Sequence, residues 1–101
     1  MDNTKISIAE IKWVDLKSNS DDRGTLTSIE SGQCIPFEIK RIFYMHHISE
    51  GRGGHSHLDT DQVIIPISGQ FKIDIHDGQN QQTFVMDDCT QGLYVPRRLF
   101  T

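Results

Sequence analysis

The sequence lacks the features that mark membrane, secreted and nucleic-acid-binding proteins. Its 101 residues contain no apolar run near the length of about 18 residues that a transmembrane helix needs. Residues 1–5 begin no apolar signal-peptide region. There is no basic block, and the formal net charge of −4 disfavours binding to a nucleic-acid duplex. We therefore expect a cytoplasmic protein with neither a membrane nor a nucleic acid as a partner.

Cysteine and apolar residues are both scarce. Cys34 and Cys89 are the two cysteines, and their spacing fits neither a metal site nor a disulfide framework. We interpret both as structural or incidental thiols in a reduced compartment. Apolar residues make up 36% of the chain, which is low for a monomer with a deep core. This composition favours a core shared with a second subunit, and so a homodimer.

Helical periodicity is missing too, and short alternating segments take its place. Separated by turn signals, such segments are typical of an antiparallel sandwich or barrel. The expected strands are residues 6–16, 25–30, 39–45, a stretch from 55 onward, 70–76, 82–86 and 93–95. The polar, turn-rich residues 17–24 are expected to form a loop. At this length we expect one all-β domain over residues 1–101.

Two histidines dominate the candidate chemistry. His55 and His57 follow a Gly-rich turn and are separated by one residue, so both side chains project from the same face of a strand. Two imidazoles on one sheet face indicate a metal site or acid–base chemistry. The alternative is a pair of histidines on a solvated strand face.

The spacing after these histidines resembles the first motif of the cupin β-barrels. In metal-binding cupins an acidic residue four or five positions on joins the two histidines, and a glycine closes the hairpin. Counting back from Gly69, that position is Gln62, whose amide is a poor metal ligand. Asp61 stands next to it, but alternation along a strand sends Asp61 to the opposite face. We therefore expect a cupin barrel with its histidines and without a metal.

Several stretches together resemble one group of cupins, the WxcM-like sugar-nucleotide 3,4-ketoisomerases that act on dTDP-4-keto-6-deoxyglucose. The stretches run in the same order from about residue 20 to the end. They are Asp22-Arg23-Gly24-Thr25-Leu26, Ile35-Pro36-Phe37, Ile39-Lys40-Arg41-Ile42-Phe43-Tyr44, Arg52-Gly53-Gly54-His55-Ser56-His57, Gln62-Val63, Ser68-Gly69 and Gly92-Leu93-Tyr94-Val95.

The resemblance implies a homodimer of cupin (jelly-roll) barrels, often with an exchanged N-terminal strand. It also implies that no metal or organic cofactor is used, and that the protein acts in making deoxysugars for bacterial surface glycans such as O-antigen lipopolysaccharide. The family continues for some tens of residues beyond Thr101. We therefore expect the chain to end within the second cupin motif, with the C-terminal part of the barrel incomplete.

The implied reaction moves a carbonyl from C4 to C3 of the hexose through an enediolate. A base takes the proton from C3 and an acid returns one at C4, and His55 and His57 are the catalytic candidates for both steps. Either histidine can be the base, and either C4 epimer can be the product. Tyr44 is the candidate donor to the developing oxyanion. Its alternative interpretation is a barrel-wall aromatic residue.

Binding of the dTDP group requires donors for two phosphates. Arg23, Arg41 and Arg52 lie in three of the best-matched stretches, and the planar guanidinium suits phosphate oxygens. Gln62 is a candidate partner of the sugar or of a catalytic histidine. The alternative is that the arginines are solvated and that the Gln62 amide simply faces the core.

Two other functions compete with the isomerase. A metal-dependent cupin oxygenase would need a third and a fourth ligand besides His55 and His57, and the second motif supplies no histidine before Thr101. A non-catalytic cupin that binds sugar nucleotides would keep the arginines and need no proton transfer.

Overall fold

The computed structural model describes residues 8–46, 60–97 and 99. One short 3₁₀ helix and seven β-strands lie within these residues. They are η1 (Ile8–Glu10), β1 (Lys12–Asp15), β2 (Lys17–Asp21), β3 (Gly24–Ser28), β4 (Gln62–Ile64), β5 (Phe71–His76), β6 (Gln81–Met86) and β7 (Gln91–Val95). The prediction of an all-β fold is confirmed. Among the described residues, no helix is long and apolar enough to cross a membrane.

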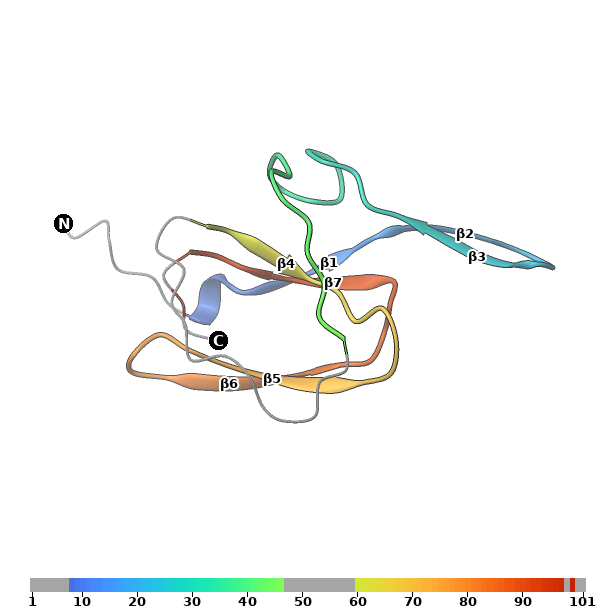
Figure 1. Ribbon diagram of the computed structural model, residues 1–101. Helices are drawn as coiled ribbons and strands as arrows, with labels where there is room; N and C mark the ends of the chain where they lie inside the picture. Colours follow the sequence, from blue (N-terminus) through green and yellow to red (C-terminus); the bar gives the residue numbers. More distant parts are fainter. Residues whose placement is uncertain (1–7, 47–59, 98, 100–101) are drawn as a thin grey trace.

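Strand β7 is the centre of the larger sheet. It pairs antiparallel with β1 on one edge, where Trp13 lies opposite Leu93, and with β4 on the other, where Gln62 lies opposite Val95. The order β1-β7-β4 places the first described strand beside the last one. The hairpins β2–β3 and β5–β6 form two further two-stranded sheets, with β5–β6 lying below the central sheet in Figure 1.

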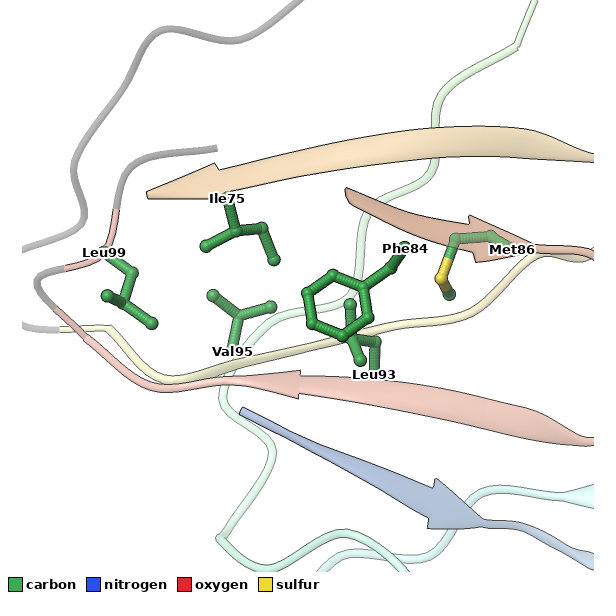
Figure 2. Close-up of a cluster of buried hydrophobic side chains, with 6 residues drawn as sticks. All are labelled: Ile75, Phe84, Met86, Leu93, Val95 and Leu99. Atoms are coloured by element: carbon green, nitrogen blue, oxygen red, sulfur yellow. The ribbon is translucent and has the colours of Figure 1, made fainter. Parts of the chain in front are cut away.

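The main hydrophobic core fills the space between the central sheet and the β5–β6 hairpin. Its buried residues come from both layers and from the segment after β7, and Figure 2 shows their side chains pointing toward one another. They are Ile75, Phe84, Met86, Leu93, Val95 and Leu99. Burying such side chains stabilises the fold by about 1.5–3 kcal/mol each. The two layers are therefore held together by apolar contact.

A smaller core covers the opposite face of the central sheet. Val14, Leu16 and Ile35 are buried there, with Phe37 and Tyr94 packed against them. Because Tyr94 lies between Leu93 and Val95 in β7, alternation along the strand directs it away from the main core. Strand β7 thus contributes to both cores.

The β5–β6 hairpin confirms the clearest alternating pattern in the sequence. Ile73 and Ile75 face the main core, as the two-residue period predicts.

The carboxylate of Asp77 accepts the backbone N–H groups of Asn80 (2.8 Å) and Gln79 (2.9 Å), and these bonds lower its pKa. It also accepts the N–H of Ile8 at 3.1 Å, which ties η1 to the hairpin loop.

The prediction of a loop over residues 17–24 is wrong, because these residues form most of a second hairpin. Strands β2 and β3 pair in register, with Ser18–Thr27 and Ser20–Thr25 hydroxyl contacts of 2.8 Å between them. Every residue of β2 is exposed. The polar sequence indicated a loop, but a strand with no buried face needs no apolar alternation.

The predicted strand over residues 39–45 is also wrong. Residues 39–46 have no regular secondary structure, and no described residue forms a ladder with them. Ile42 and Tyr44 are each 79% exposed. The β-branched and aromatic composition favours an extended chain, but a strand also requires a hydrogen-bonded neighbour. The expected histidine-bearing strand at 55–57 lies outside the described residues.

Replacing Leu93 with alanine tests the role of β7 in the main core. Leu93 is fully buried, so Leu93→Ala should lower the free energy of unfolding by about 2–5 kcal/mol. Val85→Ala is the control, because Val85 is 49% exposed and should cost under about 1 kcal/mol. Urea unfolding followed by tryptophan fluorescence measures both. Equal, small losses in the two variants would contradict the assignment of the core.

Candidate functional site

The candidate residues come from separate parts of the chain. Arg23 lies at the turn of the β2–β3 hairpin, Arg41 and Tyr44 lie in the irregular segment 39–46, and Gln62 begins β4. The predicted residues His55, His57 and Arg52 lie outside the described residues.

Gln62 is positioned by the β4–β7 ladder. It lies opposite Val95, and such cross-strand neighbours project from the same face of a sheet. Val95 belongs to the main core, so the Gln62 side chain is directed to the face that the β5–β6 hairpin covers. It is half-buried there. The amide is thus held at the edge of the space between the two layers.

Arg41 and Tyr44 are both exposed, and each lies beside the ring of a nearby residue. The Arg41 guanidinium lies 5.2 Å from the centre of the Phe43 ring, a cation–π arrangement. The Tyr44 ring lies 5.7 Å from the ring of His46 and is 79% exposed. Both polar ends are therefore accessible in the single chain.

Arg23 is far more isolated. Its Nη2 group donates to Asp21 at 3.0 Å within the same turn, and its side chain is 88% exposed. Both the side chain and the backbone N–H of Arg23 donate to the Asp21 carboxylate, which lowers the pKa of Asp21. Figure 1 shows this hairpin projecting away from the two packed layers. The single chain does not bring Arg23 together with Gln62.

A polar pair that the sequence did not reveal lies next to Gln62. The Asp61 carboxylate accepts the backbone N–H of Arg97 at 2.9 Å, its Nε at 3.3 Å and its Nη2 at 3.2 Å. Partial burial raises the pKa of Asp61, but the hydrogen bonds and charge of Arg97 outweigh it, so the pKa lies below its ordinary value. The two residues are 36 positions apart, and no local pattern joins them.

Tyr94 is a structural residue on the other face of β7. Lys12 lies 5.5 Å from the centre of its ring, and Phe37 packs at 6.2 Å. Burial and the nearby Asp61 charge raise the pKa of its hydroxyl. Tyr94 therefore stays protonated at neutral pH.

The cysteines and acidic residues of the described segments form no metal site. No group of three or more histidine, cysteine, aspartate or glutamate side chains is close enough to hold a metal ion there. Cys34 and Cys89 are both free thiols. His55 and His57 are not among these described residues.

Comparison with known proteins decides the family. A family model described as "FdtA: WxcM-like, C-terminal" matches residues 9–101. The chain belongs to this family. The resemblance inferred from the ordered stretches of sequence is thereby confirmed.

The relatives are named as 3,4-keto- or oxoisomerases. The chain is 36% identical over 88 residues to the TDP-4-oxo-6-deoxy-alpha-D-glucose-3,4-oxoisomerase of Aneurinibacillus thermoaerophilus, covering 85% of this chain and 63% of the relative. It thus spans less than two thirds of the length of this curated relative.

Solved structures of one enzyme match the fold closely. The sugar 3,4-ketoisomerase QdtA from Thermoanaerobacterium thermosaccharolyticum, in complex with TDP, superposes with a TM-score of 0.85 at 32% identity, covering 89% of this chain and 67% of that one. Its histidine-to-asparagine variant in complex with TDP-4-keto-6-deoxyglucose gives a TM-score of 0.85 at 30% identity, with the same coverage. The described strands therefore belong to an all-β fold of the cupin type.

The depressed pKa of Asp61 predicts a pH-dependent contribution to stability. A carboxylate with a lowered folded pKa stabilises the protein above its unfolded pKa, near 3.8, and loses that effect as the pH falls through the folded pKa. With Arg97 half exposed, we expect Asp61→Asn to cost about 1 kcal/mol at pH 7. Urea unfolding at pH 7 and near pH 3 should show this difference shrinking. A difference independent of pH would contradict the assignment.

Proposed function

We propose that this chain carries the catalytic domain of a sugar-nucleotide isomerase that moves the keto group of dTDP-4-keto-6-deoxyglucose from C4 to C3. The observation that carries the proposal is the close match in fold and sequence to a 3,4-ketoisomerase that holds TDP. Membership of the family and the curated oxoisomerase relative support the same reaction. The product then enters deoxysugar synthesis for surface glycans such as O-antigen, in the cytoplasm.

His55 and His57 carry the proton transfers. One imidazole takes the proton from C3, and the C4 oxygen becomes the enediolate oxygen. The proton of the C3 hydroxyl passes to the C4 oxygen, and the proton held by the imidazole is then returned to C4 as the C3 oxygen becomes the ketone. Unperturbed histidine titrates near neutral pH and so serves as base and then as acid. The relative whose histidine-to-asparagine variant holds TDP-4-keto-6-deoxyglucose supports a histidine in this chemistry.

The remaining candidates bind and orient the substrate. Tyr44 donates its hydroxyl hydrogen to the enediolate oxygen, and Gln62 holds the sugar or a catalytic histidine. The exposure of the Tyr44 side chain in the single chain leaves its hydroxyl accessible to substrate. Half-burial of Gln62 beside the core supports a fixed amide.

The diphosphate is bound by Arg23, Arg41 and Arg52, whose forked donors match phosphate oxygens. The first two have exposed side chains.

No metal is needed in this reaction, because histidine supplies the proton transfer and Gln62 replaces the acidic ligand of metal-binding cupins. Elemental analysis of protein purified without added metal tests that point, and stoichiometric iron, zinc or manganese would refute it.

Replacing each histidine tests the mechanism. Asparagine keeps polarity and approximate size but is not a base, so the variant that lacks the base should lose on the order of 10²–10⁴ in rate. The measurement is deuterium incorporation from solvent at C3 and C4 of dTDP-4-keto-6-deoxyglucose. Nucleotide binding should change little, because the arginines hold the diphosphate.

His76→Asn is the matched control, since His76 ends β5 and is not one of the candidate residues. It should retain the exchange rate of the unaltered chain. Normal exchange in both His55→Asn and His57→Asn would refute the mechanism. Nucleotide binding without any exchange in the unaltered chain would favour a non-catalytic sugar-nucleotide-binding cupin.

We also propose that residues 1–101 form one cupin domain that assembles as a homodimer. Among the described residues, the most exposed large apolar side chains of the single chain lie in three separate places. They are Leu26 on β3, Ile42, Phe43 and Met45 in the irregular segment, and Ile67 after β4. Burying such side chains against a second copy removes them from water and brings the isolated β2–β3 hairpin against a neighbour.

Light scattering tests the dimer. The mass should be close to twice 11.5 kDa at micromolar concentration. Leu26→Ser, on the 70% exposed Leu26, should shift the mass toward the monomer if β3 lies in the interface. A well-folded monomer of the unaltered chain would contradict the proposal.

A further inference from the structure

The 3₁₀ helix η1 connects the two layers at one end of the main core. It leads directly into β1 of the central sheet, and the Ile8 side chain packs against the main core. The backbone N–H of Ile8 donates to the Asp77 carboxylate at 3.1 Å, although the two residues are 69 positions apart. Asp77 follows the last residue of β5. One side chain therefore joins the start of the central sheet to the loop of the opposite layer.

The two oxygens of the Asp77 carboxylate have different roles. Oδ1 accepts the backbone N–H groups of Gln79 and Asn80, which closes the loop between β5 and β6. Oδ2 accepts the backbone N–H of Ile8. Hydrogen bonds to an ionised acceptor are stronger than those between neutral groups. The bond to η1 is thus strong, and it can be removed without removing the bonds of the turn.

Strand register places this end of the core beside Gln62. The β1–β7 ladder pairs Lys12 with Tyr94. The next position outward brings Ile11 level with Val95, and the other neighbour of Val95 is Gln62. Ile11 packs against the main core, and Figure 1 shows η1 at the end where β4 begins and β7 ends. Residues 8–11 therefore cover the end of the core toward which the Gln62 amide is directed.

The position of η1 depends on contacts outside the helix. It has three residues, and the backbone N–H of Ile11 donates to the Ile8 carbonyl at 3.1 Å. Ile8 and Ile11 are half-buried, whereas Ala9 and Glu10 are exposed. A helix of one turn is not stable by itself, because its nucleation is unfavourable. Such an element opens locally at a lower free-energy cost than core strands do.

We propose that residues 8–11 form a strap that closes the Gln62 end of the main core and that the Asp77 carboxylate holds closed. Opening of the strap exposes this end of the core to water and to a ligand. The claim on ligand entry rests on the proposed function, in which Gln62 contacts the sugar or a catalytic histidine. The claim on closure does not, because it has readouts that need neither ligand nor turnover.

Variants on both sides of the bond test the strap. Asp77→Ser keeps one oxygen for the donors of the turn and leaves no second oxygen for Ile8. Ile8→Pro removes the donor instead, and proline is tolerated in the first turn of a helix. Ile8→Ala keeps the N–H and removes the apolar side chain, so it separates the packing from the bond.

Asp88→Ser is the matched control. One oxygen of the Asp88 carboxylate accepts both the backbone N–H and the hydroxyl of Thr90, within the turn before β7. The substitution therefore alters a similar turn without touching the strap. It should behave as the unaltered chain in every measurement below.

The first readout is amide hydrogen exchange followed by nuclear magnetic resonance. In Asp77→Ser the Ile8 amide should exchange about tenfold faster, because its acceptor is gone. The Asn80 amide and those of β7 should keep their rates, which separates local release from a loss of global stability. Unchanged exchange at Ile8 would overturn the proposal. If the Asn80 amide loses its protection as well, Ile8→Pro provides the same cut with an intact turn, and the Ile11 amide must then exchange faster.

The second readout is the exchange of the Gln62 side-chain amide hydrogens with water, measured by saturation transfer. Both Asp77→Ser and Ile8→Pro should quicken it by up to about tenfold, the factor by which the strap opens more often. Ile8→Ala, which keeps the bond, should have a smaller effect than Ile8→Pro. An unchanged Gln62 rate in a folded variant with a released strap would overturn the closure.

The third readout is the kinetics of TDP binding by stopped flow. A strap across the route of the ligand slows entry and exit alike. Asp77→Ser should therefore raise the association and dissociation rate constants together, by about tenfold, with Kd changed less than about threefold. An unaltered association rate constant would overturn the role in ligand entry. If the unaltered chain does not bind TDP, the proposed function fails, and exchange at Ile8 and Gln62 alone decides the strap.

Discussion

Pairing of β7 on both of its edges is the constraint on which the rest of the described structure depends. β1 and β4 are far apart in the sequence and meet through β7 alone. Leu93 and Val95 carry the main core on one face, and Tyr94 carries part of the second core on the other. Gly92 permits this packing, because a Cβ atom there would overlap the Val63 side chain. Loss of β7 would remove both cores together.

Strand β7 also positions part of the candidate site. Gln62 is directed to the core face because it lies opposite Val95. The Asp61 carboxylate, directly before β4, accepts the backbone N–H of Arg97, two residues after the end of β7. By contrast, Arg23 and Tyr44 lie on parts of the chain that no described strand of the central sheet pairs with. The candidate residues that β7 positions and those that are exposed therefore lie in different segments.

Sequence reasoning succeeded where one strand face is buried and failed where burial gives no signal. Residues 71–76 alternate because one face of β5 meets the main core, and that pattern predicted the hairpin. Strand β2 (Lys17–Asp21) buries neither of its faces, so the sequence indicated a loop where the structure has a strand. Residues 39–45 have strand-forming composition, but their pairing depends on a neighbour that composition does not specify. The family, in contrast, was recognisable from ordered short stretches.

Only part of the candidate site was predictable from the sequence. The His-x-His spacing singled out the histidine pair, and the resemblance to the first cupin motif singled out Gln62. The link between Asp61 and Arg97 spans 36 residues and depends on where a ladder ends, which only the three-dimensional register reveals. No pattern in the sequence around Arg97 therefore indicates that its guanidinium is held by a carboxylate.

The most direct test of the account is to follow the keto group itself. Substrate dTDP-4-keto-6-deoxyglucose labelled with ¹³C at C3 is incubated with the purified chain and observed by ¹³C nuclear magnetic resonance. The account predicts that the labelled carbon changes from a hydroxyl-bearing carbon to a ketone, with no added metal or cofactor. A labelled carbon that stays hydroxyl-bearing, in the presence of protein that binds TDP, would contradict it.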